Sequence, residues 1–371
     1  MQKVTPWEVK GEVDYSKLIK EFGTSPISES LLKRIKNHTK DLHFMLTRKI
    51  FFYHRDLPWL LDEYEKNNKF FLYTGRAPSG NIHLGHLVPW IFTKWLQDKF
   101  NVDLLFQFPD EEKVVFKKDL TFEDTEKFTR ENMLDVIALG FSPKKTKFII
   151  DTVHANLMYK QAMRVAKKIT FSTVKATFGL TDQSNIGQIF YTSMQAVPAF
   201  LPSVIKNKNI PCLIPLAIDQ DAHFRVSRDV MPKLGYYKPA IIHSTFLPSL
   251  LGPKGKMSAS SSQDTIYTTD SPKTVELKIK KYAFSGGQPT ITEHKQKGGN
   301  PDIDISYQYL KMLFEPDDKK LENIYQNYKS GSLLTSELKE ILIKKINFFL
   351  KKHQQKREQA KKNINKFILP T

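Results

Sequence analysis

Apolar residues are spaced in two different ways along the chain between residues 70 and 246. Short apolar runs stand apart from longer stretches in which apolar residues recur every three or four positions. The short runs predict buried strands, and the longer stretches predict helices with one apolar face. The predicted strands are residues 70–75, 103–108, 147–151, 212–218 and 240–246. Such alternation is typical of βαβ units, so the pattern predicts an α/β, Rossmann-like, doubly wound parallel sheet.

The clearest helical pattern follows the first of these strands. In residues 84–100 the apolar side chains fall on one helix face, and Pro89 lies early enough in the helix to be tolerated. A second helix is predicted from Thr121, which forms a capping-box pattern with Asp124, to about Gly140.

Beyond about residue 270 the strand pattern stops and only helical patterns follow. We therefore expect residues 70–268 to form the α/β domain and residues 269–371 to form a helical domain. Residues 1–69 are mixed in pattern, with a helical-looking segment at 28–46, and are expected to pack on the α/β domain as an N-terminal extension.

Composition excludes several classes of protein. No apolar run approaches the ~18 residues that a membrane helix requires, so no membrane partner is expected. Glu8, Glu12 and Asp14 near the start argue against a secretory or mitochondrial targeting peptide. Cys212 is the only cysteine and lies in an apolar run, so we expect a buried thiol, no disulfide and no structural zinc site. A reducing, cytoplasmic location fits best.

The formal net charge of +18 indicates an anionic partner. Residues 344–366 carry nine basic residues against Glu358 alone. A solvated helix face also explains such a run, but together with the charge of the whole chain it favours nucleic acid.

The turn after the first predicted strand carries the first candidate chemistry. Gly75 and Gly80 allow close approach of the backbone, and the following helix directs its N-terminal N–H groups towards an anion. His83 and His86 share a helix face there, and Gly85 between them leaves a flat surface for an adenine ring. A surface histidine pair and half a metal site remain alternatives, although no metal site is expected because no further ligands accompany the pair. A nucleotide phosphate accounts for all these features together.

A second candidate is Lys256 in the glycine- and serine-rich stretch 252–262. A flexible linker is one interpretation. A mobile loop that brings a lysine onto a phosphate in the transition state is the other.

Two polar clusters follow predicted strands, at residues 106–113 and 216–225. Each is weak evidence alone, because adjacent acids on surface turns are usually solvated.

The motifs HLGH at 83–86 and KMSAS at 256–260 together resemble the two signatures of the class I aminoacyl-tRNA synthetases. YTGRAPSG, AIDQDAHFR and KYAFSGGQPTITEH extend the likeness to the tryptophan-specific family, of the eukaryotic cytosolic type. The resemblance covers about residues 4–365. It implies a Rossmann catalytic domain and a helical anticodon-binding domain after it.

This resemblance implies that L-tryptophan is activated by Mg²⁺-ATP and transferred to tRNA(Trp). It assigns the following catalytic residues: His83, His86, Lys256, Ser258 and Ser260. It assigns these ATP contacts: Gly75, Arg76, Gly85, Lys113, Arg225 and Met257. It assigns these tryptophan contacts: Tyr73, Gln107, Glu112, Gln195 and Gln220. Ala259 stands where the lysine signature usually ends in a second lysine, so phosphate charge could come from Lys113 or Arg76 instead.

The resemblance further implies a homodimer, a base-reading neighbourhood at 298–310 that includes Asp302, and a flap containing Trp7 over the ATP site. A core tryptophan is the alternative for Trp7. Three rival functions stay open at this point: a tyrosine-specific synthetase, a small-molecule adenylyltransferase and a noncatalytic RNA-binding protein.

Overall fold

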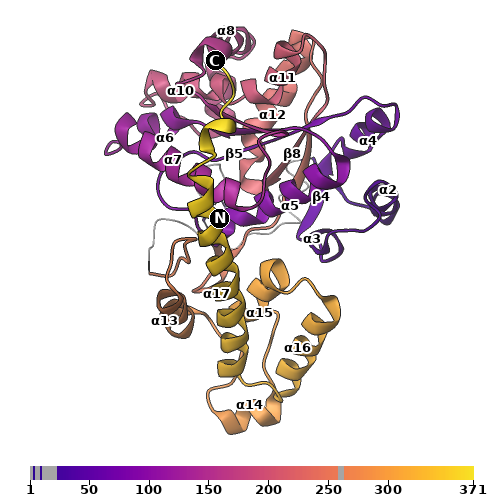
Figure 1. The fold of residues 1–371 in the computed structure, drawn as a ribbon, viewed down its shortest axis with the longest axis vertical. Coiled ribbons are helices and arrows are strands. Elements are labelled where there is room, and N and C mark those ends of the chain that lie inside the picture. Colours follow the sequence, from indigo (N-terminus) through magenta and orange to yellow (C-terminus); the bar gives the residue numbers. More distant parts are fainter. Residues whose placement is uncertain (1–2, 5–8, 11–22, 258–262) are drawn as a thin grey trace.

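A seven-stranded sheet covered by helices forms the upper body of the molecule in Figure 1, and a group of helices lies below it. The computed structural model describes residues 3–4, 9–10, 23–257 and 263–371. The sheet has the order β3–β4–β9–β8–β5–β6–β7. Its strands are β3 (Ser25–Pro26), β4 (Phe51–Arg55), β5 (Phe71–Gly75), β6 (Leu104–Phe108), β7 (Thr146–Ile150), β8 (Cys212–Ala217) and β9 (Ala240–Ser244).

The five predicted strands are confirmed as β5 to β9, and they pair in parallel. Because helices cover both faces, these strands read as nearly continuous apolar runs. β6 and β9 are buried along their whole length.

One edge of the sheet differs from the prediction of a purely parallel arrangement. β4 pairs antiparallel with β9, and β3 pairs antiparallel with β4. Burial does not alternate along β4: Phe51 and His54 are buried, and the two residues between them are half-buried. The strand therefore lacks the alternation of apolar and polar residues that predicts a strand. Part of the N-terminal 69 residues therefore belongs to the sheet itself.

The central strands β5 and β8 lie side by side, and the chain leaves them towards opposite edges of the sheet. Such a switch of direction opens a crevice at the carboxyl ends of the two strands, where α/β proteins bind their ligands.

The helices around the sheet agree with the predicted pattern. The helix predicted at 84–100 is α5, and the helix after Thr121 is α7, which begins with the predicted capping box to Asp124. The segment at 28–46 contains two short helices rather than one. The helices of this region are α2 (Glu29–Thr39), α3 (Phe44–Thr47), α4 (Leu57–Glu65), α5 (Leu84–Phe100), α6 (Asp110–Phe116), α7 (Phe122–Ala138), α8 (Ala155–Ala166), α9 (Phe171–Phe178), α10 (Ile186–Met194), α11 (Leu201–Ile205) and α12 (Asp221–Val230).

After the sheet, a hairpin leads into the helical region. The hairpin consists of β10 (Pro248–Ser249) and β11 (Gly252–Lys256), so the described part of the stretch that we expected to be a mobile loop is a strand. The helices that follow are α13 (Pro272–Tyr282), α14 (Ile291–Lys297), α15 (Ile305–Tyr309), α16 (Asp318–Ser330) and α17 (Thr335–Ala360).

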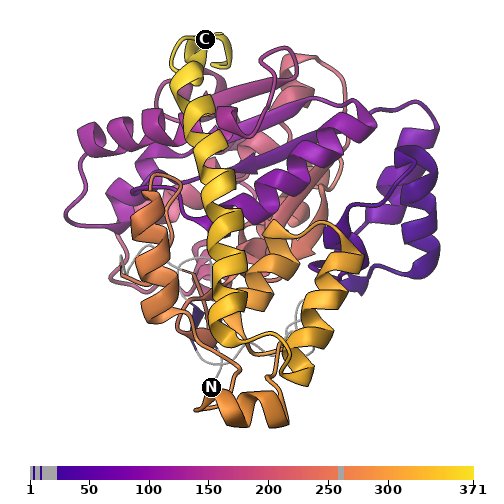
Figure 2. The same ribbon diagram turned by 60° about the horizontal axis from the view of Figure 1, so that its bottom comes forward.

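The long helix α17 joins the helical region to the sheet domain. It starts among the lower helices and runs upwards against α7 and α13 (Figures 1 and 2). Asp135 of α7 is buried and accepts hydrogen bonds from His353 (2.9 Å) and Arg357 (3.1 Å) of α17. These buried contacts join the helical part of the chain to the sheet domain.

The last residues of the chain return to the sheet. The N–H of Phe148 in β7 donates to the carbonyl of Phe367 (2.7 Å), and the N–H of Leu369 donates back to the carbonyl of Phe148 (2.9 Å). The tail thereby covers the open edge of β7. None of the helices in the described part is both long enough and apolar enough to cross a bilayer.

Candidate active site

A cavity of about 530 Å³ lies at the carboxyl ends of β5 and β8, at the switch point of the sheet. The turn after β5, the end of β6, the segment after β8 and the hairpin strand β11 all contribute to its wall.

Most of the site residues expected from the sequence line this single cavity. They are Tyr73, Gly75, Arg76, His83, Gly85, His86, Gln107, Glu112, Lys113, Gln195, Gln220, Lys256 and Met257. Arg225 is not among the lining residues; it lies on α12 and contacts the carboxylate of Asp221 (3.3 Å). Ser258, Ser260 and Trp7 fall outside the described residues.

The two histidines stand at the start of α5 with their rings stacked, at 3.6 Å between centroids. The Nδ1 atom of His86 accepts a hydrogen bond from the backbone N–H of His83 (3.2 Å), which caps the helix. His86 Nε2 is therefore the protonated nitrogen and remains a donor. The turn is held from the other side, where the N–H of Leu84 donates to the carbonyl of Ile266 (3.1 Å).

Both imidazoles are neutral at ordinary pH. Burial, followed by the nearby charges of Arg76 and Lys256, lowers the pKa of His83 to about 3. Burial and Arg76 also hold the pKa of His86 well below its usual value. These side chains can donate hydrogen bonds to an anion without carrying charge themselves.

Two glycines are required by the close packing around this turn. A Cβ at Gly75 would lie 2.8 Å from the carbonyl oxygen of Gln107 on the neighbouring strand. A Cβ at Gly85 would lie 3.0 Å from the ring of His83. Larger residues would displace the strand end or the histidine.

Among the described residues, four cationic side chains line the cavity: Arg76, Lys113, Lys117 and Lys256. Lys113 pairs with Glu112, and Lys256 donates to Asp219 (2.7 Å). Burial lowers the pKa of Arg76 to about 10. Sequence reasoning missed Lys117, although it lies one helical turn after Lys113.

A buried polar network also lines the cavity. Gln195 Nε2 donates to the hydroxyl of Tyr73 (2.8 Å), and that hydroxyl donates to Gln107 Oε1 (2.5 Å). Tyr191 donates to Glu112 (2.9 Å), and its hydroxyl also contacts the amide oxygen of Gln195. Burial raises the pKa of Tyr73 far above its usual value, so its hydroxyl stays protonated.

Tyr191 is a second residue that the sequence reasoning missed. It lies four positions before Gln195 on α10, and this spacing on one helix face was the available signal. His223 also lines the cavity, and burial lowers its pKa to about 4, so it too is neutral.

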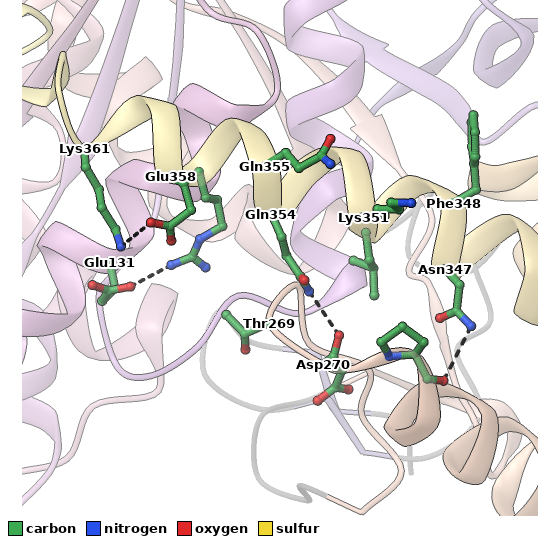
Figure 3. A pocket seen from close by; sticks show the side chains of 13 residues that line it. Glu131, Thr269, Asp270, Asn347, Phe348, Lys351, Gln354, Gln355, Glu358 and Lys361 are labelled. Carbon is green, nitrogen blue, oxygen red and sulfur yellow. Dashed lines mark hydrogen bonds and ion pairs between the residues drawn. The ribbon is translucent and has the colours of Figure 1, made fainter.

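A second cavity, of about 830 Å³, shares no lining residue with the first. It lies along α17 and is closed by Glu131 of α7 and by residues 269–272 (Figure 3). Two pairs of its charged groups contact one another, Arg357 with Glu131 and Lys361 with Glu358. The smaller cavity, which most of the expected site residues line, is therefore the candidate active site. The described residues include no cluster of three or more side chains suited to hold a metal ion.

Comparison with known proteins gives a consistent result. Residues 65–351 match the family model described as "tRNA synthetases class I (W and Y)". A tryptophan–tRNA ligase of Sulfurisphaera tokodaii is 55% identical over 98% of this chain and 94% of its own, and that of Saccharolobus solfataricus is 53% identical over the same shares. The chain is also similar to the crystal structure of Plasmodium falciparum tryptophanyl-tRNA synthetase, with a TM-score of 0.91 and 43% sequence identity. The match covers 96% of this chain and 98% of the Plasmodium chain.

These relatives correct one expectation and decide among the rivals. The curated relatives at 53–55% identity are archaeal, so the narrower expectation of a eukaryotic cytosolic type is not supported. Their names specify tryptophan rather than tyrosine, and ligase activity rather than binding alone.

Proposed function

The chain belongs to the class I tRNA synthetases for tryptophan and tyrosine and catalyses the ATP-dependent joining of L-tryptophan to tRNA(Trp), and on this premise we propose which residues carry each step. One observation supports the assignment above all others: His83, His86 and Lys256 line one cavity, although about 170 residues separate the two motifs.

The first step needs positioning and charge neutralisation more than a base. The carboxylate of tryptophan attacks the α-phosphorus of ATP, the adenylate forms, and pyrophosphate leaves. Because the attacking carboxylate is already ionised, no proton has to be removed from it. In the second step a ribose hydroxyl of the terminal adenosine attacks the carbonyl carbon, and AMP leaves.

We assign the phosphates of ATP to the end of the cavity formed by the histidine turn. His83 and His86 are neutral donors there, and Arg76, Lys113 and Lys256 supply positive charge. Lys256 would exchange its bond to Asp219 for one to a phosphate oxygen. The adenine ring would lie over the bare backbone of Gly85, beside Met257.

Tryptophan is assigned to the part of the cavity that the buried polar network lines. Tyr73 and Gln107 face the indole, while Glu112, Gln195 and Gln220 take the ammonium and carboxylate groups. A site built to bind an N–H rejects analogues that lack it by up to ~10⁴–10⁵.

Mg²⁺ would enter with ATP. The cavity's carboxylates, Glu112 and Asp219, are engaged by lysines, so the ion would keep phosphate oxygens and water as its main ligands, as Mg²⁺ commonly does. When bound, it would neutralise phosphate charge.

The helical part of the chain is proposed to bind the anticodon arm of the tRNA. Its lysines would meet phosphates, and exposed polar groups would read unstacked bases. Asp302 is one such group: it is exposed and accepts a hydrogen bond from Tyr325 (3.1 Å). The second ligand surface therefore lies on helices that α17 connects to the catalytic domain.

We further propose a homodimer formed through the face of α8 and α10. Tyr159 and Met163 are one turn apart on α8 and are 59% and 47% exposed, and Ile186 at the start of α10 is 79% exposed. The ring of Tyr159 lies 6.3 Å from that of Phe190, which makes the two helices one apolar surface. Such a surface on an otherwise charged protein is typical of an interface.

The proposed division of the chain keeps the boundaries 1–69, 70–268 and 269–371, with β3 and β4 as the part of the first segment that enters the sheet. A reducing, cytoplasmic location accords with Cys212, a buried free thiol.

The direct test is charging of tRNA(Trp) with purified protein and a panel of amino acids. Charging with tryptophan alone is expected. Charging with tyrosine at a comparable rate would contradict the assignment of Tyr73 and Gln107 to the indole.

A further inference from the structure

We propose that Asp151 is a positioning residue that fixes the side-chain amide of Gln107 with its oxygen, not its NH₂ group, turned towards the indole N–H. This inference rests on the proposed role of Gln107 in tryptophan binding. It adds a specificity determinant that does not touch the substrate.

The direction of the network requires this orientation. Tyr73 accepts from Gln195, so its single proton is donated to Gln107 Oε1. The other amide atom, Gln107 Nε2, donates to Asp151 Oδ2 at 2.7 Å. Because a carboxylate oxygen can only accept a hydrogen bond, Asp151 Oδ2 holds the NH₂ group of Gln107 away from the cavity. The carbonyl-type oxygen of Gln107 keeps a second lone pair for the indole N–H.

Asp151 lies outside the cavity wall but is almost fully buried, with 1% of its surface exposed, just as Gln107 is. It follows directly after β7, while Gln107 lies on the neighbouring strand β6. Pairing of the two strands thus holds donor and acceptor in register.

A second carboxyl, that of Glu111, interacts electrostatically with Asp151. Both oxygens of Glu111 and Asp151 Oδ1 are buried and have no hydrogen-bond partner among the described residues. Burial is the main cause that raises the pKa of Glu111 to about 8, and the charge of Asp110 adds to it. Burial also raises the pKa of Asp151, and the charge of Glu111 adds to that shift. The pair therefore retains a proton at neutral pH. That proton lies on Glu111 or on Asp151 Oδ1, because Asp151 Oδ2 already accepts from the NH₂ group of Gln107.

The test compares L-tryptophan with β-(3-benzothienyl)alanine, in which sulfur replaces the indole N–H. The ratio of their kcat/KM values in pyrophosphate exchange measures recognition of the N–H. In Asp151→Leu, an apolar replacement of similar size, Gln107 can turn its NH₂ group inwards. We expect the ratio to fall by about 10- to 100-fold, mainly through a higher KM for tryptophan, with the KM for ATP unchanged.

Two variants separate orientation from general damage. Asp151→Asn keeps an acceptor for Gln107 and can donate its NH₂ group to Glu111, so the ratio should be retained. Thr146 lies on β7, the strand that Asp151 follows, and its hydroxyl accepts a buried hydrogen bond from Gln97 of α5 (3.0 Å). Thr146→Val removes this bond and should leave the ratio unchanged. Asp151→Val serves as a smaller alternative if Asp151→Leu does not fold.

The outcomes distinguish this inference from the proposed function. If Gln107→Leu collapses the ratio while Asp151→Leu and Asp151→Val do not, the orienting role is overturned and the tryptophan site stands. If Gln107→Leu leaves the ratio intact, the proposed tryptophan site itself fails. Equal loss in Asp151→Asn and Asp151→Leu would also overturn the role, because Asn retains the acceptor.

Discussion

The ammonium of Lys256 lies 2.7 Å from the carboxylate of Asp219, and both side chains line the cavity. Lys256 ends the strand β11, whereas Asp219 follows β8, so the contact joins the lysine motif to the central sheet. The lysine is thus held at the wall of the cavity, in the part that we assign to the phosphates of ATP.

Replacement of Lys256 by Ala should slow tryptophan-dependent pyrophosphate exchange by about 10²–10³, the usual loss for one preorganised donor. Tryptophan binding, measured by fluorescence or calorimetry, should be largely unchanged because Lys256 is not among the residues that we assign to tryptophan. Lys118→Ala, an exposed lysine that does not line the cavity, is the matched control. Near-normal exchange in the Lys256 variant would contradict its role.

The depressed histidine pKa values predict a specific pH profile. With the pKa of His83 at about 3 and that of His86 well below its usual value, pyrophosphate exchange should show no inflection near pH 6.5. The unfolded chain binds protons at His83 below about pH 6.5 and the folded protein does not, so stability falls as the pH decreases from there towards 3. His83→Asn should reduce this slope in urea titrations at several pH values. An unchanged slope would show that His83 is protonated in the folded protein.

Glu111 predicts a pH effect of opposite sign. Its pKa in the folded protein is about 8 against an ordinary value of 4.5, so the folded protein retains a proton there that the unfolded chain has released. This contribution to stability is complete below about pH 4.5 and is lost as the pH rises to 8. Glu111→Gln stays neutral at every pH. Its free energy of unfolding should therefore rise by about 1–3 kcal/mol relative to that of the parent protein between pH 5 and pH 8, since one pKa unit corresponds to about 1.36 kcal/mol. If the free energies of unfolding of Glu111→Gln and the parent protein differ by the same amount at pH 5 and at pH 8, the pKa of Glu111 is not raised.

The buried contact between α7 and α17 should control transfer to tRNA more than adenylate formation. Asp135→Ala leaves His353 buried without its acceptor and Arg357 with Glu131 alone. It should cost about 3 kcal/mol of unfolding free energy, the lower end of the range for removing one partner of a buried ion pair. The helical region would lose these buried contacts with the sheet domain, so charging of tRNA should fall more than pyrophosphate exchange does. Asp124→Ala is the control: it removes the side-chain acceptor of the Thr121 N–H (3.2 Å) in the capping box at the other end of α7, and it should cost only about 1 kcal/mol.

The proposed dimer face predicts a change in assembly. Ile186→Asp should shift the protein towards monomer in sedimentation velocity, because a charge at the centre of an apolar contact is costly. Ile291→Asp on α14, a comparably exposed position at 63%, should leave assembly unchanged. A monomeric parent protein at micromolar concentration would refute the interface outright.

Local pattern determined much of this molecule. The five parallel strands, the helix that begins at the histidine turn and the helical character of the C-terminal part all follow from apolar spacing, because each depends on which face of a short segment is buried. Composition likewise indicated an anionic partner. The two motifs at 83–86 and 256–260 predicted binding of the same nucleotide from the sequence alone.

Only the tertiary structure decided which distant residues meet. The antiparallel addition of β4, the return of the tail to β7, and the pairs Lys256–Asp219, Gln107–Asp151 and Asp135–Arg357 join segments 37 to 222 residues apart. Periodicity describes one segment at a time and carries no information on such contacts. They form when packing of the sheet brings the ends of different strands together, and burial then changes the pKa and the hydrogen-bonding direction of each group.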